Sequence, residues 1–171
     1  MRLFIAVATM IGIVGLAAMQ SNGPPKKEDI PKLISALKTS PNPKVRIQAV
    51  EDIGYRGAIR ASDVDIAIEP MMHALKADKD AEVRRACAKA LGSIGTNAEK
   101  CVPALIESLK DGALVVKIAA AQALGQFGPD AKEALPALRD LAKMKDSKDD
   151  KKVSQVAAAA VKSIMVIEKK K

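Results

Sequence analysis

Few residues of this 171-residue chain are of the types that perform covalent or metal chemistry. There is one histidine, His73, and there are two cysteines, Cys87 and Cys101. A zinc or haem site requires several clustered ligands, and these three residues do not supply them at a metal-binding spacing. The sequence also lacks a glycine-rich phosphate loop and a G-x-S-x-G motif. We therefore predict a protein that is not an enzyme, with no catalytic residues, no metal and no cofactor.

The two cysteines raise the question of a disulfide bond. Cys87 lies eight residues before Gly95, which corresponds to about 12 Å of rise if this segment is helical. Cys101 lies near the start of the helix that is expected to return after Gly95. This axial offset exceeds the reach of a disulfide, so the spacing disfavours the bond, although an oxidising compartment would permit one. We interpret Cys87 as a small core residue in a position that other copies fill with alanine.

A repeated block of 13 residues contains Cys87 and defines the elements that position it. The block VRRACAKALGSIG at 83–95 recurs as VKIAAAQALGQFG at 116–128 and VRIQAVEDIGYRG at 45–57, and in eroded form as VSQVAAAAVKSIM at 153–165. The first valines of successive copies are 38, 33 and 37 residues apart. A unit that repeats at this period predicts a stacked array rather than one globular core.

Each unit shows two helical patterns. The first places apolar residues at i, i+3, i+4 and i+7, as in Ile30, Leu33, Ile34 and Leu37; Ile68, Met71, Met72 and Leu75; and Val102, Leu105, Ile106 and Leu109. Prolines one residue into these stripes predict helix starts at Pro31, Pro103 and Pro136. The second pattern packs through the positions four, five and eight residues after the valine. Paired glycines at Gly54/Gly57, Gly92/Gly95 and Gly125/Gly128 are expected to end that helix and to let the next helix approach. His73 takes the place of Glu107, so we expect it to be exposed and inert.

The pattern D-x-V-R-x-x-A-x-x-A-L-G-x-x-G, preceded by P-x-L-I, resembles HEAT repeats of the short type that is also found in phycobilisome lyase HEAT-like proteins. The resemblance runs from Asp29 to about Ile167. It implies an all-α fold, a right-handed α-solenoid of about four HEAT-like helix pairs. The repeat domain would span 28–168, with units at about 28–57, 66–95, 99–128 and 132–168. The motif is specific for the fold and weak for function, because it occurs in scaffolds, adaptors and some enzymes.

In such repeats an acidic turn residue and the arginine after the valine link neighbouring units. The resemblance therefore implies a structural ladder. Its expected members are Asp78 or Asp80 with Arg84, Asp111 with Lys117, and Arg46, whose own turn offers only Ser40 and Asn42.

Two units depart from the pattern. In the fourth, Arg139 replaces an apolar stripe residue, the turn expands to KMKDSKDDKK, and Lys162 and Met165 replace both glycines. A terminal unit needs a polar outer face, so we predict a C-terminal cap. In the first, the segment YRGAIRASDVD adds about five residues before the next helix, and it fits either a binding rim or a tolerated loop.

The first 18 residues resemble a secretory signal peptide. A charged start at Arg2 precedes an apolar run over 3–18, and a linker with Gly23, Pro24 and Pro25 follows over 19–27. We expect export to the periplasm or the medium. The alternatives are a short membrane anchor through 3–18, which would be the only contact with a membrane, or an apolar start without a targeting role. A basic tail occupies 169–171.

The formal net charge of +8 permits acidic partners, but it does not favour nucleic acid. Base-stacking aromatics are nearly absent and the lysines are scattered along the chain. In HEAT-like arrays the second helices commonly line the concave side, so we expect a partner protein or peptide there. The candidate positions lie two, six and ten residues after the valines: Ile47, Glu51 and Tyr55; Arg85, Lys89 and Ser93; Ile118, Gln122 and Gln126. Two alternatives are a lyase-associated protein that positions a chromophore or its acceptor protein, and a nucleic-acid-binding HEAT-like protein.

Overall fold

The computed structural model describes residues 24–143 and 148–165, and within them every regular element is helical. The predictions for the leader at 1–18, for 19–23 of the linker and for the basic tail lie outside the described residues. Eight α-helices form four pairs: α1 (Ile30–Thr39) with α2 (Pro43–Ile59), α3 (Asp65–Ala77) with α4 (Ala81–Ile94), α5 (Ala98–Ser108) with α6 (Leu114–Phe127), and α7 (Leu135–Lys143) with α8 (Lys148–Met165). Three short 3-10 helices accompany them, η1 (Lys27–Asp29), η2 (Ala61–Asp63) and η3 (Gly128–Ala134).

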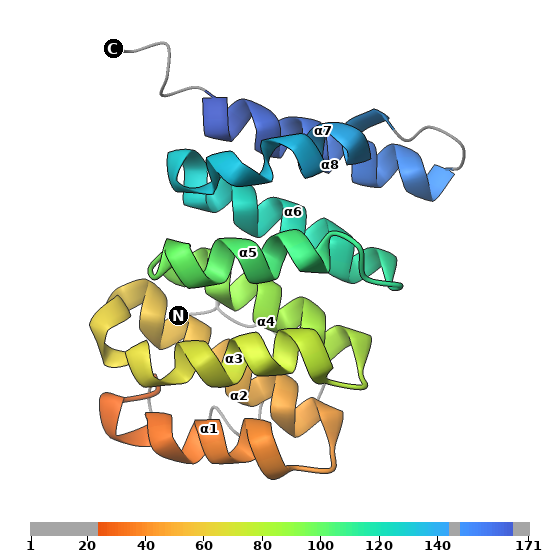
Figure 1. The fold of residues 1–171 in the computed structure, drawn as a ribbon. Coiled ribbons are helices and arrows are strands. Elements are labelled where there is room, and N and C mark those ends of the chain that lie inside the picture. The colour runs from red at the N-terminus through yellow and green to blue at the C-terminus, as the bar shows by residue number, and fades with distance from the viewer. Residues whose placement is uncertain (1–23, 144–147, 166–171) are drawn as a thin grey trace, which may run out of the picture.

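The pairs stack in chain order into a two-layered column (Figure 1). In one layer α2 packs on α4, α4 on α6 and α6 on α8, and in the other α1 packs on α3 and α3 on α5. The segment η3, rather than α7, packs against α5 and extends the first-helix layer to the fourth unit. Because each unit packs mainly on the next, the chain is an all-α solenoid, as predicted from the repeat.

The apolar stripes form one continuous core along the column. All nine predicted packing positions of the second helices are buried, namely Ala49, Val50 and Ile53; Cys87, Ala88 and Leu91; and Ala120, Ala121 and Leu124. In the first three units the outer two residues of the first stripe are also buried, as Ile68 and Leu75 are in α3. Many residues of this core are alanine. Their small side chains let packed helices approach closely where alanine and glycine meet.

The predicted role of the glycines as helix ends is wrong at four of six positions. Helix α2 continues through Gly54 and Gly57, and Gly92 and Gly125 also lie inside helices. Gly95, with a φ of 66°, and Gly128, with a φ of 57°, adopt positive φ directly after α4 and α6. The glycines inside the helices serve close approach instead. A Cβ on Gly92 would lie 2.7 Å from the Cα of Ala123 on α6, and one on Gly54 would lie 3.0 Å from the Cβ of Ala90 on α4.

One predicted helix start is also displaced. Pro31 lies in the first turn of α1 and Pro136 is the second residue of α7, as expected. Helix α5, however, begins at Ala98, so Pro103 is an interior residue. The turn before α5 is short because Asn97 takes the left-handed conformation, with a φ of 55°, and its backbone carbonyl accepts hydrogen bonds from Lys100 and Cys101. The local apolar stripe could not reveal this extra turn of helix.

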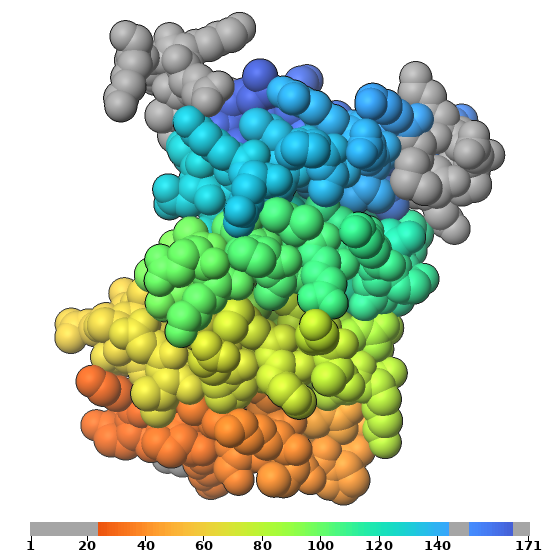
Figure 2. Space-filling model, viewed as in Figure 1, coloured from red at the N-terminus to blue at the C-terminus, as the bar shows by residue number. Residues whose placement is uncertain are grey.

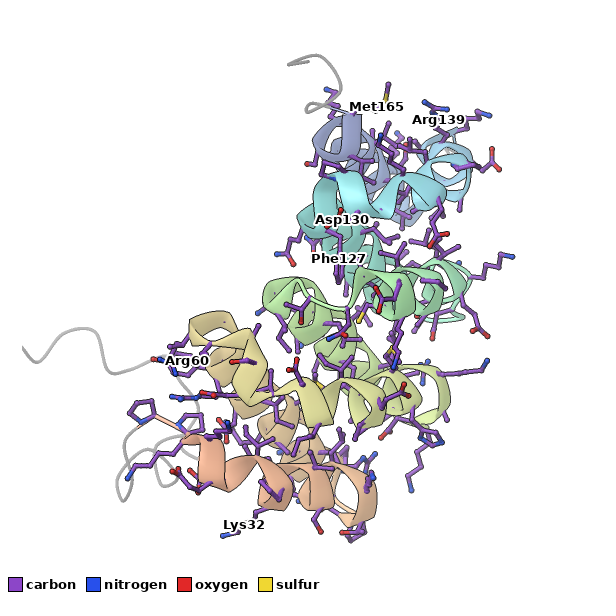
Figure 3. All side chains as sticks on the ribbon, turned by 60° about the vertical axis from the view of Figure 1, so that its left-hand side comes forward. Lys32, Arg60, Phe127, Asp130, Arg139 and Met165 are labelled. Carbon is purple, nitrogen blue, oxygen red and sulfur yellow. The ribbon has the colours of Figure 1, made fainter. Side chains whose placement is uncertain are left out.

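The inserted segment after Gly54 folds back onto the column instead of forming a free rim. It extends α2 and adds η2, whose Asp63 is 6% exposed. Arg56 donates to Asp63 at 2.8 Å through Nε, and the Nζ of Lys27 lies 3.8 Å from Asp63 Oδ1. Figure 3 shows Arg60 beyond these contacts, at the edge of the molecule.

The fourth unit has polar and partly exposed residues on its outer side. Arg139 and Met165 lie at the same end of the column (Figure 3), with Arg139 Nη2 3.7 Å from Met165 Sδ. Lys162 is exposed, whereas Ile164 is fully buried. The outer side therefore resembles a solvated cap over an apolar interior.

Within residues 24–143 and 148–165, none of the helices combines the length and the hydropathy that a membrane span requires.

Candidate protein-interaction face

The nine candidate positions lie on α2, α4 and α6, in the layer of second helices. We call this set the second-helix strip. Six members are exposed and three, Ile47, Arg85 and Ile118, are half-buried. The opposite side, formed by the first helices, presents successive units as stacked bands (Figure 2). Offsets of two, six and ten residues differ by four, and side chains four residues apart lie on the same face of a helix. The strip therefore follows directly from the repeat.

A groove of about 290 Å³ lies between α2 and α4 and contains five members of the strip. Its walls carry the polar members Glu51, Tyr55, Arg85, Lys89 and Ser93. Its remaining lining consists of Gly54, Ala58, Ala86 and Ala90, the small residues that let the two helices approach. The groove therefore combines a small apolar floor with polar walls.

A second groove of about 480 Å³ continues the surface over α6 and α8. It contains Gln122 and Gln126, and Lys89 lines both grooves. Ile47 and Ile118 line neither groove. From α8 come Val156, Ala159 and Ser163, which the sequence prediction did not include. Ala159 and Ser163 stand six and ten residues after Val153, so extending the same register to the fourth unit would have found them.

The charges in the first groove are partly compensated. Arg85 Nε donates to Glu82 at 2.6 Å, an exposed pair within α4 that holds the guanidinium weakly. Lys89 forms no hydrogen bond or ion pair with another described residue. On the first-helix side, two exposed lysines are paired across units, Lys76 with Glu107 at 3.1 Å and Lys100 with Glu69 at 3.2 Å. The strip thus keeps a cation available at the junction of its two grooves.

The turns carry a different set of charges, which join the units. Arg46 donates to Asp78 through Nε and Nη2, both at 2.7 Å, and through Nη1 to the carbonyl of Ser40 at 2.9 Å. Arg84 repeats the arrangement with Asp111, at 2.7 and 2.9 Å, and its Nη1 donates to the carbonyl of Asp78 at 2.8 Å. These bidentate pairs are the geometry that arginine and carboxylate favour. We call the two pairs the arginine clamps.

The partners differ from those expected, because each arginine reaches the aspartate of the following unit. Arg84 therefore pairs with Asp111 and not with the side chain of Asp78 or Asp80. Asp80 is occupied as the N-cap of α4, where its carboxylate accepts from the backbone N–H of Glu82 and Val83. Lys117 forms no ion pair with Asp111 among the described residues, and the carboxylate oxygens of Asp111 accept from Arg84 and from the backbone N–H of Ala113. The arginine at the start of a second helix faces the turn of the following unit, not the turn of its own unit. Which turn it faces depends on how the units stack.

The clamps shift the pKa of both aspartates. The hydrogen bond from Arg84 is the main cause that lowers the pKa of Asp111 below its ordinary value. For Asp78, burial raises the pKa, but hydrogen bonds from Arg46 and from the backbone of Asp80, with the charges of Arg46 and Arg84, outweigh it and lower the pKa overall. The ionised forms are therefore favoured in the folded state.

Stability should consequently fall in acid. Asp78 and Asp111 have a lower pKa when folded than when unfolded, so their contribution is complete above the unfolded value near 4 and is lost as the pH falls through the folded values. We expect urea unfolding followed by circular dichroism to show a falling free energy of unfolding below about pH 4. An Arg84→Gln variant should show a shallower fall. Equal slopes in both proteins would contradict a role for the clamp.

The reactive residues identified in the sequence are not brought together. Cys87 and Cys101 are free and fully buried, and burial raises the pKa of both thiols, that of Cys101 to about 11. His73 is exposed beside the turn that contains Asp78. Among the described residues no group of three or more His, Cys, Asp and Glu side chains has an arrangement suited to a metal ion.

Comparison with known proteins agrees with this architecture. The family model described as HEAT repeats matches residues 30–100 and 68–162. The structure is similar to a crystal structure of an engineered protein from the Northeast Structural Genomics Consortium, with a TM-score of 0.59 and 26% identity over 80% of this chain and 62% of the other. It is also similar to the complex of CpcE and CpcF of phycocyanin lyase from Nostoc sp. PCC7120, with a TM-score of 0.63 and 25% identity over 87% of this chain and 57% of the other. The alignments thus span less than two thirds of either of these chains. No curated protein matches the sequence.

Proposed function

Since the chain belongs to the HEAT-repeat family, we propose that it is a non-enzymatic scaffold that binds a partner protein along the second-helix strip. The observation that carries this proposal is the groove between α2 and α4, which contains five of the nine positions selected from the repeat register alone. Packing accounts for the buried valines, alanines and glycines of the repeat, but it does not account for exposed polar residues over a small apolar floor. Such a surface suits contact with another protein.

The proposal includes export. A charged and then apolar start over 1–18 supports it. Cell fractionation followed by N-terminal sequencing of the mature protein tests this part. Cleavage after Ala17 or Ala18, which gives a mature protein that begins at Ala18 or Met19, is expected in the extracytoplasmic fraction, and an intact Met1 in the cytoplasm would contradict it.

Site-specific photocross-linking in the producing cells tests the binding face. A benzophenone amino acid at Gln122, which is exposed on the strip, is expected to form an adduct with a discrete partner protein. The same group at Ser35, which is exposed on α1, is the matched control and should form none. Adducts from Ser35 but not from Gln122 would move the binding face to the first helices.

A second candidate is a role beside a lyase, and the structural similarity to CpcE and CpcF favours it. In this role the solenoid would position a chromophore or its acceptor protein. Titration with a bilin pigment distinguishes the two candidates, because a lyase-associated protein should shift the absorbance of the pigment. An unchanged spectrum together with a Gln122 adduct would leave the scaffold.

A further inference from the structure

We infer that the partner presents an extended, acidic peptide segment to the second-helix strip, with a carboxylate placed against Lys89. This inference rests on the proposed function and specifies the chemistry of its partner. It follows from three features of the strip: its charge, its hydrogen-bonding groups and the spacing of its helices.

The charge argument starts from Lys89. This side chain lines both grooves and has no partner among the described residues, while Arg85 in the first groove is held only by an exposed pair with Glu82. Glu51 is the one carboxylate among the nine members of the strip, and Glu82 pairs with Arg85, so Lys89 is the cation of the strip that has no ion-pair partner among the described residues. A carboxylate near Lys89 would complete an ion pair at the place where the two grooves meet. An acidic segment is the complementary occupant.

The hydrogen-bonding groups favour an extended chain over a helix. Ser93, Gln122, Gln126 and Ser163 line the grooves with hydroxyl and amide groups that both donate and accept. An extended segment has unpaired backbone N–H and C=O groups that need such partners, whereas a helix satisfies its own. The small floor of Gly54, Ala86 and Ala90 also lets a backbone approach closely.

The spacing of the helices sets the period of contact. Packed helices lie roughly 8–10 Å apart, and an extended chain advances about 3.3 Å per residue. A segment that crosses the strip therefore meets each successive second helix about every third residue. Three steps separate α2 from α8, so the contact covers about nine residues.

A nucleic acid is the less suitable occupant. A phosphate backbone carries a charge at every nucleotide and needs a series of cations along its path. The strip offers Arg85 and Lys89 on a single helix, followed on α6 by Ile118, Gln122 and Gln126, which are uncharged. Its single aromatic residue is Tyr55.

The probe is a library of random ten-residue peptides displayed on phage and selected against the purified protein. We expect the selected peptides to share a glutamate or aspartate at one position. In fluorescence anisotropy, Lys89→Glu should weaken binding of a selected peptide about ten-fold, because attraction becomes repulsion. A peptide whose acidic residue is changed to lysine should bind Lys89→Glu better than it binds the wild type. Lys32→Glu, an exposed charge reversal on α1, is the matched control and should leave binding unchanged (Figure 3).

The outcomes separate this inference from the proposed function. Selected peptides that lack an acidic residue, but lose affinity when Gln122 is changed to arginine, would overturn the inference and leave the strip as the binding face. Peptides that bind every strip variant equally would overturn both. An empty selection would overturn the inference, while photocross-linking at Gln122 tests the scaffold independently. Displacement of a selected peptide by a ten-nucleotide single-stranded DNA, lost in Lys89→Glu, would assign the strip to nucleic acid instead.

Discussion

Replacing Arg46 with alanine is expected to lower the free energy of unfolding by about 3–5 kcal/mol. The side chains of Arg46 and Asp78 are 6% and 9% exposed, so the substitution leaves a buried carboxylate without its cation. It also removes the donor to the carbonyl of Ser40, the C-cap of α1. Urea unfolding followed by circular dichroism at 222 nm measures the loss.

Two further variants show whether the loss comes from the clamp. Arg85→Ala removes an exposed pair with Glu82 on α4 and should cost less than about 1 kcal/mol. The double variant Arg46→Ala with Asp78→Ala should be less destabilised than the sum of its single variants, because no uncompensated charge remains. Strict additivity would mean that Arg46 and Asp78 stabilise the column separately.

Substituting Gly92 with alanine is expected to destabilise the protein by about 2 kcal/mol, although alanine is the better helix former. Overpacking of a tight contact costs up to about 3 kcal/mol, and the gain in helix propensity returns about 1 kcal/mol. The new Cβ would lie 2.7 Å from both the Cα and the Cβ of Ala123, so α4 and α6 must separate. The side-chain oxygen of Gln126 also lies close to this point, but it can rotate away.

Gly112 provides the matched control for this substitution. A Cβ there meets nothing within 4 Å, and its φ lies outside the left-handed region. Gly112→Ala should therefore leave stability unchanged or raise it slightly, because the unfolded chain loses freedom. Thermal unfolding of both variants measures the difference. A Gly92→Ala protein as stable as the wild type would show that the two helices can separate at little cost.

The arginine clamps and the close contacts of Gly92 lie at successive interfaces of the same column. Arg46 and Asp78 join the first unit to the second, and Arg84 and Asp111 join the second to the third. Helix α4 meets α6 at Gly92, across the interface of the second and third units. Rigid spacing of the second helices therefore depends on both devices, and the proposed peptide period of about three residues depends on that spacing.

What the sequence by itself determined is the local part of this protein. The 3.6-residue period identifies which side chains of a helix turn inward, so the burial of residues such as Val50, Leu91 and Leu124 could be predicted without coordinates. The same period selected the second-helix strip, since exposure and burial are complementary faces of one helix. It also identified Cys87 as a core residue, because alanine fills that position in other copies.

Tertiary structure decided the features that depend on how one unit sits upon the next. The partners Arg46 and Asp78 are 32 residues apart, whereas the sequence pattern had assigned Asp78 or Asp80 to Arg84. The glycines were expected both to end helices and to permit close approach, but Gly54 and Gly92 lie inside helices, where only the close approach of a second helix applies. Val156 joined the grooves only when α8 was placed beside α6. Periodicity is a property of one helix, whereas the arginine clamps, the close approach at glycine and the grooves each require two helices. How one unit is placed on the next is set by side-chain packing across their interface.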